Sequence, residues 1–162
     1  SYVLDGRDAS RLNRGELADV RGKKIGFVFQ SYNLLPRMSA LGNVMLGLKY
    51  AGIRDRDMAR VALERVGLGD RMGHKPNELS GGEQQRVAIA RAITKEPPVI
   101  LADEPTGNLD SKSSEEIMNI LVSLHKEQGN TLIMITHEPD MAAYCQRIIH
   151  LKDGQVVKDE KL

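Results

Sequence analysis

Two adjacent carboxylates, Asp103 and Glu104, follow the apolar run Val99–Ala102. The run predicts a buried strand, so both acids are expected at its carboxyl end, where open α/β sheets bind ligands. Neighbouring side chains on a strand point in opposite directions, which favours different roles for the two acids. One can hold Mg²⁺, directly or through water, and the other can orient and polarise an attacking water. An acidic helix start after a strand explains the pair alone about equally well.

A second candidate is Ser80-Gly81-Gly82, which precedes a long helical pattern. A helix start of this kind exposes backbone N–H groups at the positive end of the helix dipole, which favours phosphate. The glycines let the backbone approach a ligand that side chains would block. Taken alone, the motif is more simply explained as a serine-capped helix after a glycine turn.

Gln30 and His137 each follow a further apolar run that predicts a buried strand, and neither residue would be notable alone. Their combination with the acidic pair changes this. Three predicted strands each end in a polar residue suited to a nucleotide–Mg²⁺ site, and a phosphate-binding helix start lies between two of them. Asp110 adds a turn shortly after the acidic pair.

The elements that must position these residues alternate between strands and helices, which predicts an α/β fold with a largely parallel sheet. Strands are expected at Tyr2–Leu4, before a turn at Asp5-Gly6, and at Lys24–Phe29, Val99–Ala102 and Thr131–Thr136, with a hairpin over Arg147–Val157 that turns at Asp153-Gly154. Helices are expected at Glu16–Val20 (closed by Gly22), Ser39–Gly52, Asp55–Val66, from Ser80 to Pro97, and around Ile117–Leu124 up to Gly129. Residues 38–73 show helices without a strand, the pattern of a helical insertion.

Composition narrows the class of protein. The 162 residues carry 23 Lys and Arg against 22 Asp and Glu, a balance that gives no electrostatic reason to expect nucleic acid as a partner. Hydrophobic residues at 41% and charged residues at 28% indicate a folded globular chain. The single cysteine, Cys145, excludes an internal disulfide and a Cys-based metal site. No apolar run approaches the roughly 18 residues that a membrane-spanning helix requires.

With these motifs together, the sequence resembles the nucleotide-binding subunit of ABC transporters, whose Q-loop, signature, Walker B, D-loop and H-loop motifs occur here in family order. The stretches Phe29–Pro36 and Asp103–Ser111 are similar to the branch that serves lipoprotein release, macrolide export and related force transmission. The resemblance implies a P-loop NTPase-like (RecA-like) parallel sheet core. It also implies one domain over residues 1–162, with a helical subdomain at about 38–93 that includes the signature helix.

The resemblance further implies catalytic and metal-binding roles. Asp103 would hold Mg²⁺, and Glu104 would act as general base on the hydrolytic water. Gln30 would contact Mg²⁺ or that water and relay motion to a membrane subunit. His137 would contact the γ-phosphate of ATP.

Dimerisation is implied in the same way. Ser80, Gly81 and Gly82 would bind the γ-phosphate of an ATP held mainly by the opposite subunit, and Asp110 would reach across the interface. The partners would be a second ATPase subunit, in a head-to-tail homodimer, and a transmembrane permease subunit or fused membrane domain. The expected location is peripheral, on the cytoplasmic face of the inner membrane.

One motif of the family is missing from these residues. A phosphate-binding loop needs Gly-x-x-x-x-Gly-Lys-Ser/Thr between a strand and a helix. Near Gly22-Lys23-Lys24, Leu17 stands where the first Gly should be, Lys24 replaces the hydroxyl, and no helix is expected to follow. We therefore expect the N-terminal part of the core to be absent, and this segment alone to be inactive.

Two other interpretations of the sequence remain. DNA-repair and chromosome-organising ATPases also carry a Ser-Gly-Gly signature, but they place long coiled coils before it. Here Gln30 and Ser80 are only 50 positions apart, without sustained heptads. The alternative is a catalytically impaired, nucleotide-dependent binding module that pairs with an intact partner. The retained Glu104 and His137 disfavour it.

Overall fold

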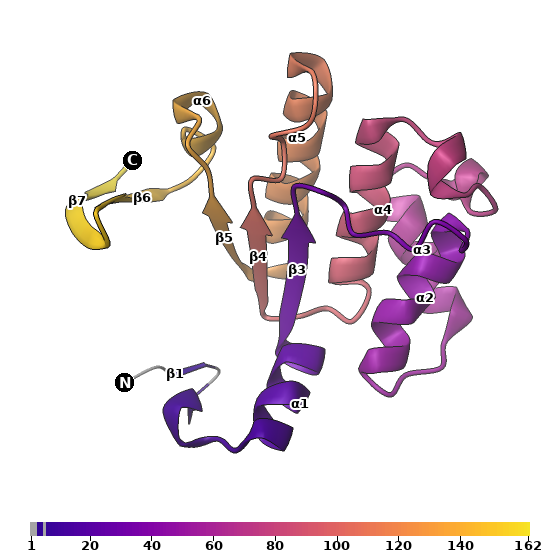
Figure 1. Ribbon diagram of the computed structural model, residues 1–162, viewed down its shortest axis with the longest axis horizontal. Helices are drawn as coiled ribbons and strands as arrows, with labels where there is room; N and C mark the ends of the chain where they lie inside the picture. Colours follow the sequence, from indigo (N-terminus) through magenta and orange to yellow (C-terminus); the bar gives the residue numbers. More distant parts are fainter. Residues whose placement is uncertain (1–2, 5) are drawn as a thin grey trace.

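A three-stranded parallel sheet forms the centre of the computed structural model, which describes residues 3–4 and 6–162 (Figure 1). Its order is β3 (Ile25–Phe29), β4 (Val99–Asp103) and β5 (Thr131–Ile135). The register pairs Phe29 with Asp103 and Asp103 with Ile135, so all three strands end at one level. The expected parallel sheet is confirmed, and the residues that follow these strands meet at one edge.

Helices fill the interval between β3 and β4, where no strand occurs although every residue from 30 to 98 is described. They are α2 (Ala40–Tyr50), α3 (Arg56–Arg65), the short 3-10 turns η2 (Gly69–Arg71) and η3 (Pro76–Glu78), and α4 (Gly81–Ile93). The predicted cap at Ser80 forms, and Ser39 and Asp55 cap their helices in the same way. Each of the three side chains accepts a hydrogen bond from a backbone N–H of the first turn. The helical insertion is confirmed.

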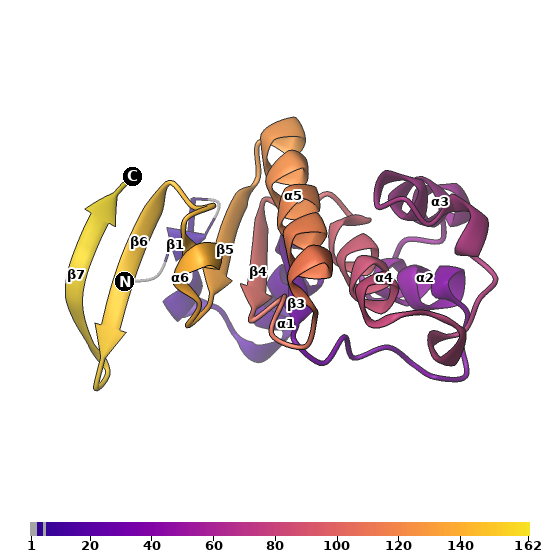
Figure 2. The same cartoon turned by 90° about the horizontal axis from the view of Figure 1, so that it is seen from above.

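One face of the sheet is fully packed. Val28, Ile100 and Ala102 point to this face and are at most 1% exposed. They belong to a core that also contains residues of α4 and of α5 (Ser111–Gln128), which lies across the sheet in Figure 2. Helix α5 ends at Gly129, in the left-handed conformation that favours glycine, as expected.

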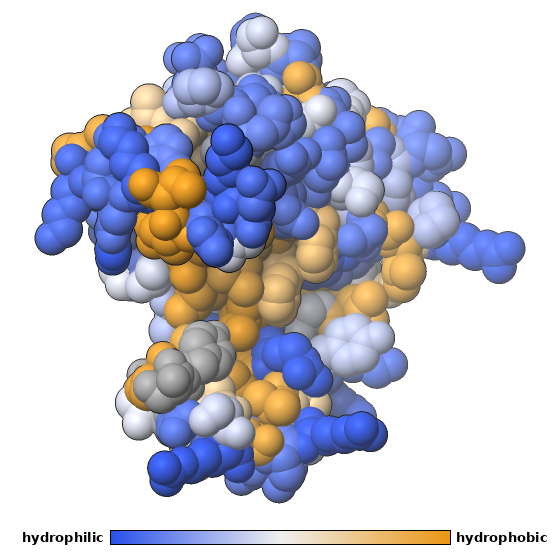
Figure 3. All heavy atoms as spheres, turned by 60° about the vertical axis from the view of Figure 1, so that its left-hand side comes forward, coloured by the Kyte–Doolittle hydropathy of each residue, from blue (hydrophilic) through white to orange (hydrophobic). Residues whose placement is uncertain are grey.

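The opposite face is open, and one prediction fails there. Alternate residues of β5 point to it, and the side chains of Ile133 and Ile135 are 49% and 62% exposed. The expectation that β5 is buried is therefore wrong for this face. Figure 3 shows apolar surface on the side of the molecule that carries β5. The apolar run correctly predicted a strand with two apolar faces, but among the described residues only one face has a partner.

The N-terminal segment contains β1 (Val3–Leu4), β2 (Arg7–Asp8), the 3-10 turn η1 (Ala9–Arg11) and α1 (Arg14–Lys24). The strand expected at Tyr2–Leu4 is seen at Val3–Leu4, whereas Tyr2 and Asp5 lie outside the described residues. The helix predicted over Glu16–Val20 is longer at both ends, and the prediction that Gly22 closes it is wrong. Asn13 and Glu16 form a capping box that starts the helix earlier, and Gly22 is accommodated within its last turn. Lys24 is accordingly helical, and β3 begins directly after it.

The C-terminal segment begins with the short helix α6 (Pro139–Ala142), followed by β6 (Arg147–Lys152) and β7 (Gln155–Lys161). The two strands pair antiparallel and are not hydrogen-bonded to the central sheet. Asp153 and Gly154 both have positive φ, 50° and 76°, as a two-residue hairpin turn requires. The predicted hairpin is confirmed and extends four residues past Val157.

Candidate functional site

Glu104 and His137 meet at the carboxyl end of the sheet. The Nδ1 atom of His137 lies 2.9 Å from Oε1 of Glu104, although the residues are 33 positions apart. The backbone N–H of Glu104 donates to the carbonyl of Ile135, which fixes the residue after β4 to the end of β5. Glu104 has a φ of 44°. A left-handed conformation outside glycine costs about 1–3 kcal/mol and gathers at functional sites, so this carboxylate is held in a strained, defined position.

Gln30 approaches the same edge from β3. Its Nε2 lies 3.4 Å from Oδ1 of Asn108, and the Asn108 Nδ2 donates to the Gln30 carbonyl at 3.1 Å. A Cβ added to Gly107 would lie only 2.6 Å from Gln30 Nε2. The loop after Glu104 therefore carries both the contact that orients the Gln30 amide and the glycine that makes room for it. Neither Gly107 nor Asn108 was assigned a function from the sequence, because nothing in a local pattern shows a contact across 78 positions.

Asp103 is the last residue of β4 and is exposed, as a ligand for a metal–nucleotide complex must be. Among the described residues, no cluster of three or more His, Cys, Asp or Glu side chains could hold a metal by itself. Mg²⁺ is typically bound by one or two carboxylates together with phosphate oxygens and water. Asp103, with the amide oxygen of Gln30 at the neighbouring strand end, fits that requirement.

Ser80, Gly81 and Gly82 form the start of α4. The Ser80 hydroxyl accepts from the backbone N–H of Glu83 at 3.2 Å, and the Glu83 carboxylate accepts from the Ser80 N–H at 2.8 Å. This hydrogen bond from the Ser80 backbone is the main reason why the pKa of Glu83 is lowered. The N–H groups of Gly81 and Gly82 have no acceptor within the helix, because the first turn of a helix leaves them free. The motif can thus offer two donors and a hydroxyl to an anion.

The surroundings of this helix start differ from those of Glu104 and His137. The atoms nearest to a Cβ placed on Gly81 or Gly82 belong to Tyr32, Leu109 and Ser113, and none belongs to Glu104 or His137. The sequence-predicted residues therefore form two groups in this chain. Gln30, Asp103, Glu104 and His137 gather at the strand ends, and Ser80–Gly82 forms the start of α4, where no atom of Glu104 or His137 is among the nearest neighbours of Gly81 and Gly82.

Asp110 caps α5 within its own chain. Its carboxylate accepts from the backbone N–H of Ser113 at 3.0 Å and from the Ser113 hydroxyl at 2.8 Å. These two hydrogen bonds, the backbone one first, lower the pKa of Asp110. The charged form is favoured at the helix start, where the dipole also favours an anion.

Gln85 connects α4 to the acidic loop and was not singled out from the sequence. It is fully buried, and its Nε2 donates to the carbonyl of Pro105 at 2.6 Å. Pro105 directly follows Glu104, so the second turn of α4 is tied to the backbone that carries Glu104. The one sequence signal that could have marked it is its position, because Gln85 stands three and four residues before Ala88 and Ile89, on the apolar stripe of the predicted helix.

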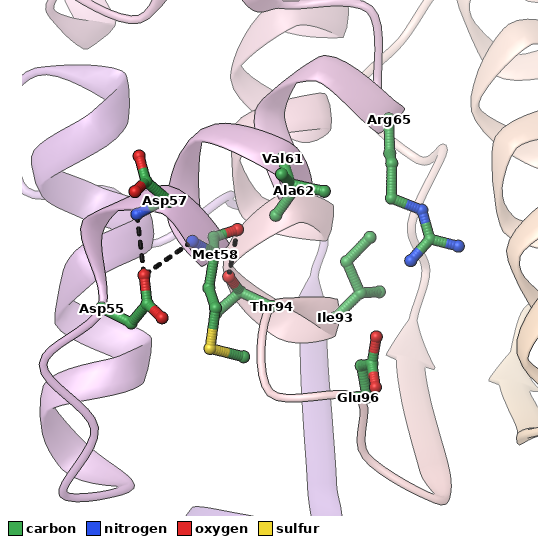
Figure 4. Close-up of a pocket in the computed structure, with 9 residues that line it drawn as sticks. All are labelled: Asp55, Asp57, Met58, Val61, Ala62, Arg65, Ile93, Thr94 and Glu96. Carbon is green, nitrogen blue, oxygen red and sulfur yellow. Dashed lines mark hydrogen bonds between the residues drawn. The ribbon is translucent and has the colours of Figure 1, made fainter.

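A pocket between α3 and the end of α4 is unrelated to this chemistry (Figure 4). The Asp55 carboxylate on its rim accepts from the backbone N–H groups of Asp57 and Met58. The Thr94 hydroxyl donates to the Met58 carbonyl. These polar groups already serve helix capping and helix packing, and no sequence-predicted site residue lines the pocket.

A parallel sheet with an acidic pair, a histidine and a glutamine at its strand ends is the arrangement of a P-loop NTPase-type ATPase core. The chain belongs to the ABC transporter family, whose model, described as "ABC transporter", matches residues 2–107. This confirms the resemblance drawn from the motifs, and with it the ATP-binding class of the chain.

Similar proteins come from several bacteria. The macrolide export ATP-binding/permease protein MacB of Chlorobaculum tepidum is 54% identical over 162 residues, which are 99% of this chain and 25% of that protein. An uncharacterized ABC transporter ATP-binding protein of Bacillus subtilis, YknY, is 54% identical over 160 residues, or 97% of this chain and 69% of that protein. A solved dimer of the ATP-binding cassette MJ0796 in a post-hydrolysis state, bound to ADP and Pi, has a TM-score of 0.85 and 46% identity, covering 98% of this chain and 71% of that one.

The chain spans about a quarter of the length of the MacB relatives and about two thirds of that of the separate ATP-binding proteins. The MacB similarity confirms the predicted macrolide-export type of branch. None of the described helices combines the length and the apolar character needed to cross a bilayer.

Proposed function

We propose that this chain forms most of the ATP-hydrolysing part of an ABC transporter that powers a membrane permease of the export or lipoprotein-release type. The observation that carries the proposal is the contact between Glu104 and His137 at the strand ends, next to Gln30. The similarity to ATP-binding/permease proteins supports the membrane partner. A peripheral position on the cytoplasmic face of the inner membrane follows from that partnership.

The chemistry assigned to the site is hydrolysis of the γ-phosphoryl group. The oxygen of the attacking water bonds to the γ-phosphorus while Glu104 accepts a proton from that water. The bond between the γ-phosphorus and the oxygen that leaves with ADP breaks. His137, held by Glu104, contacts the γ-phosphate. Asp103 and Gln30 would hold Mg²⁺, which would neutralise charge on the phosphate oxygens.

The separation of the two groups within one chain supports a head-to-tail dimer. Ser80, Gly81 and Gly82 would bind the γ-phosphate of the ATP that the other copy holds, with free N–H groups at a helix start. Asp110 would lie at the interface, where it also caps α5. Residues 38–93 would act as the helical subdomain that carries the closing movement from this dimer to the permease. The solved dimer of a similar cassette agrees with this assembly.

No phosphate-binding loop of the form Gly-x-x-x-x-Gly-Lys-Ser/Thr occurs in the 162 residues. We therefore assign the binding of the β- and γ-phosphates to residues other than these 162, and we expect the 162 residues alone to bind ATP poorly.

The test uses the complete polypeptide that contains this chain, together with its permease. Replacing Glu104 by Gln should reduce ATP turnover by about 100-fold or more, the usual worth of a general base, while an ATP-bound dimer accumulates. Turnover is measured as phosphate release and the dimer by light scattering. The matched control is Glu115→Gln, an exposed residue of α5 that should behave as the wild type.

Two results would contradict the proposal. One is a Glu104→Gln variant that hydrolyses ATP at the wild-type rate. The other is a wild-type protein that dimerises on ATP without hydrolysing it, which would support the alternative of a nucleotide-dependent binding module.

A further inference from the structure

Arg91, near the end of α4, reaches the loop that follows Gln30. Its Nη1 donates to the carbonyl of Asn33 at 2.5 Å, and its Nη2 donates to the carbonyl of Tyr32 at 2.8 Å. The residues are 58 and 59 positions apart in sequence. One guanidinium thus binds two successive backbone carbonyls of the loop.

Those two loop residues have an unfavourable backbone conformation. Tyr32 has a φ of 58° and Asn33 a φ of 49°, and neither is a glycine. The turn is tight, because the Asn33 N–H donates to the Ser31 carbonyl at 2.5 Å. Two consecutive left-handed residues with side chains persist only where surrounding groups hold them. Arg91 supplies that hold through both carbonyls.

Arg91 is itself fixed in place. Helix α2 approaches it so closely at Gly47 that an added Cβ would lie 2.8 Å from the Arg91 carbonyl and 3.1 Å from its Cγ. Burial lowers the pKa of Arg91, and no described carboxylate forms an ion pair with it. The loop carbonyls are therefore the hydrogen-bond partners of a partly buried cation. A guanidinium suits this task because its planar fork can donate to two acceptors at once, which a lysine does less well.

The same loop also touches the other end of α4. The Tyr32 hydroxyl lies 3.0 Å from the Cβ position of Gly81, at the helix start that the proposed function assigns to a γ-phosphate. Tyr32 thus contacts the first turn of α4 through its ring and the last turns through its carbonyl. A displacement of α4 must move the turn that follows Gln30.

We propose that Arg91 is a positioning residue for Gln30. By holding the Tyr32–Asn33 turn, it keeps the Gln30 amide against Gly107 and Asn108, and it couples the signature helix to that amide. The proposal rests on the function assigned above to Gln30, and it predicts that Arg91 acts through Gln30 without touching ATP.

The experiment compares Arg91→Met and Arg91→Lys in the complete polypeptide. Arg91→Met should lower kcat for MgATP by about 10- to 100-fold, since small misplacements at a site can have effects of that size. KM should stay within about threefold, because the residue makes no contact with the nucleotide. Arg91→Lys keeps the cation and one possible hydrogen bond, so it should restore part of kcat.

A double variant tests whether Arg91 acts through Gln30. If it does, Gln30→Ala combined with Arg91→Met should have the same kcat as Gln30→Ala alone. The matched control is Arg86→Met on the same helix, because Arg86 binds Glu116 and the Val66 carbonyl instead of the loop. It should lower the melting temperature but leave kcat near that of the wild type.

Hydrogen exchange gives a readout that does not need turnover. Without nucleotide, amides of residues 31–35 should exchange faster in Arg91→Met than in the wild type or in Arg86→Met. The proposal is overturned if exchange of that segment is unchanged, or if the losses in kcat from Gln30→Ala and Arg91→Met multiply. A wild-type protein without ATPase activity would instead refute the proposed function, and the exchange result would still decide the role of Arg91.

Discussion

The side chain of Gln30 shows how closely the candidate site depends on single atoms. Its amide occupies the space that a Cβ on Gly107 would fill, and it lies within hydrogen-bond distance of the Asn108 side chain. Neither of these contacts involves a charged group. The Gln30 amide is therefore placed by steric fit and a hydrogen bond from a loop almost 80 residues away in sequence. The site should be sensitive to changes that hardly affect the stability of the fold.

Gly107→Ala tests this sensitivity. The added methyl would overlap the end of the Gln30 side chain, which is flexible and can move aside, so the melting temperature should change by less than about 2 °C. The displaced amide should lower kcat by roughly 10-fold or more in the complete polypeptide. Gly73→Ala is the control, because a Cβ there meets nothing within 4 Å. Equal kcat values for the two variants would show that the Gln30 position does not matter.

Sequence alone could identify Gln30, Glu104 and His137, because each lies within two residues after an apolar run that becomes a strand of one parallel sheet. Strand ends align whenever the strands are parallel and in register, so local patterns were enough. Gly107 and Arg91 could not be found in this way. Their roles arise from contacts between distant segments, and their residue types are common in loops and helices.

At the scale of elements, helix capping decides how well the sequence predicts where a helix begins and ends. Helix α4 was placed correctly because Ser80 and Glu83 form a capping box around an evident helix start. For helix α1 the prediction over Glu16–Val20 is too short, because Asn13 and Glu16 form the equivalent capping box and Gly22 does not stop the helix. A glycine ends a helix when it takes a left-handed conformation, and Gly22 does not.

The capping box of α4 should also give the protein a dependence on acid. The hydrogen bonds of Ser80 lower the pKa of Glu83 in the folded state below the ordinary value of a glutamate. A lowered pKa contributes stability that is present above the pKa of the unfolded chain and is lost as the pH falls through the pKa of the folded protein. Glutamine can keep the hydrogen bond to the Ser80 N–H but carries no charge.

Glu83→Gln should therefore melt about 1–4 °C below the wild type at pH 7, and the difference should be smaller at pH 3. Thermal melting of the nucleotide-free complete polypeptide measures this. Glu115→Gln, on the exposed side of α5, should show no such crossover. A Glu83→Gln deficit that is the same at both pH values would mean that the charge does not contribute.

On the scale of the whole molecule, one face of the sheet is covered by helices and the other face is exposed. Parallel sheets in α/β proteins are covered on both sides, so the exposed Ile133 and Ile135 mark a surface that needs a partner. Sequence patterns predicted the strand but not which face would be open. The reason is physical, since apolar residues on both faces of a strand show that both are suited to burial and not that both are buried.

The open face predicts opposite effects of one change in two contexts. In the isolated 162-residue chain, Ile133→Thr with Ile135→Thr should weaken binding of a hydrophobic dye and reduce aggregation, because exposed apolar surface is removed. In the complete polypeptide, the same pair should lower the unfolding free energy by roughly 1–2 kcal/mol per residue if the face is buried there.

The isolated wild-type chain should also bind fluorescent ATP with Mg²⁺ only weakly. Affinity near about 1 μM with a cooperative melting transition would show that the open face and the absent phosphate loop leave the chain able to fold and bind by itself.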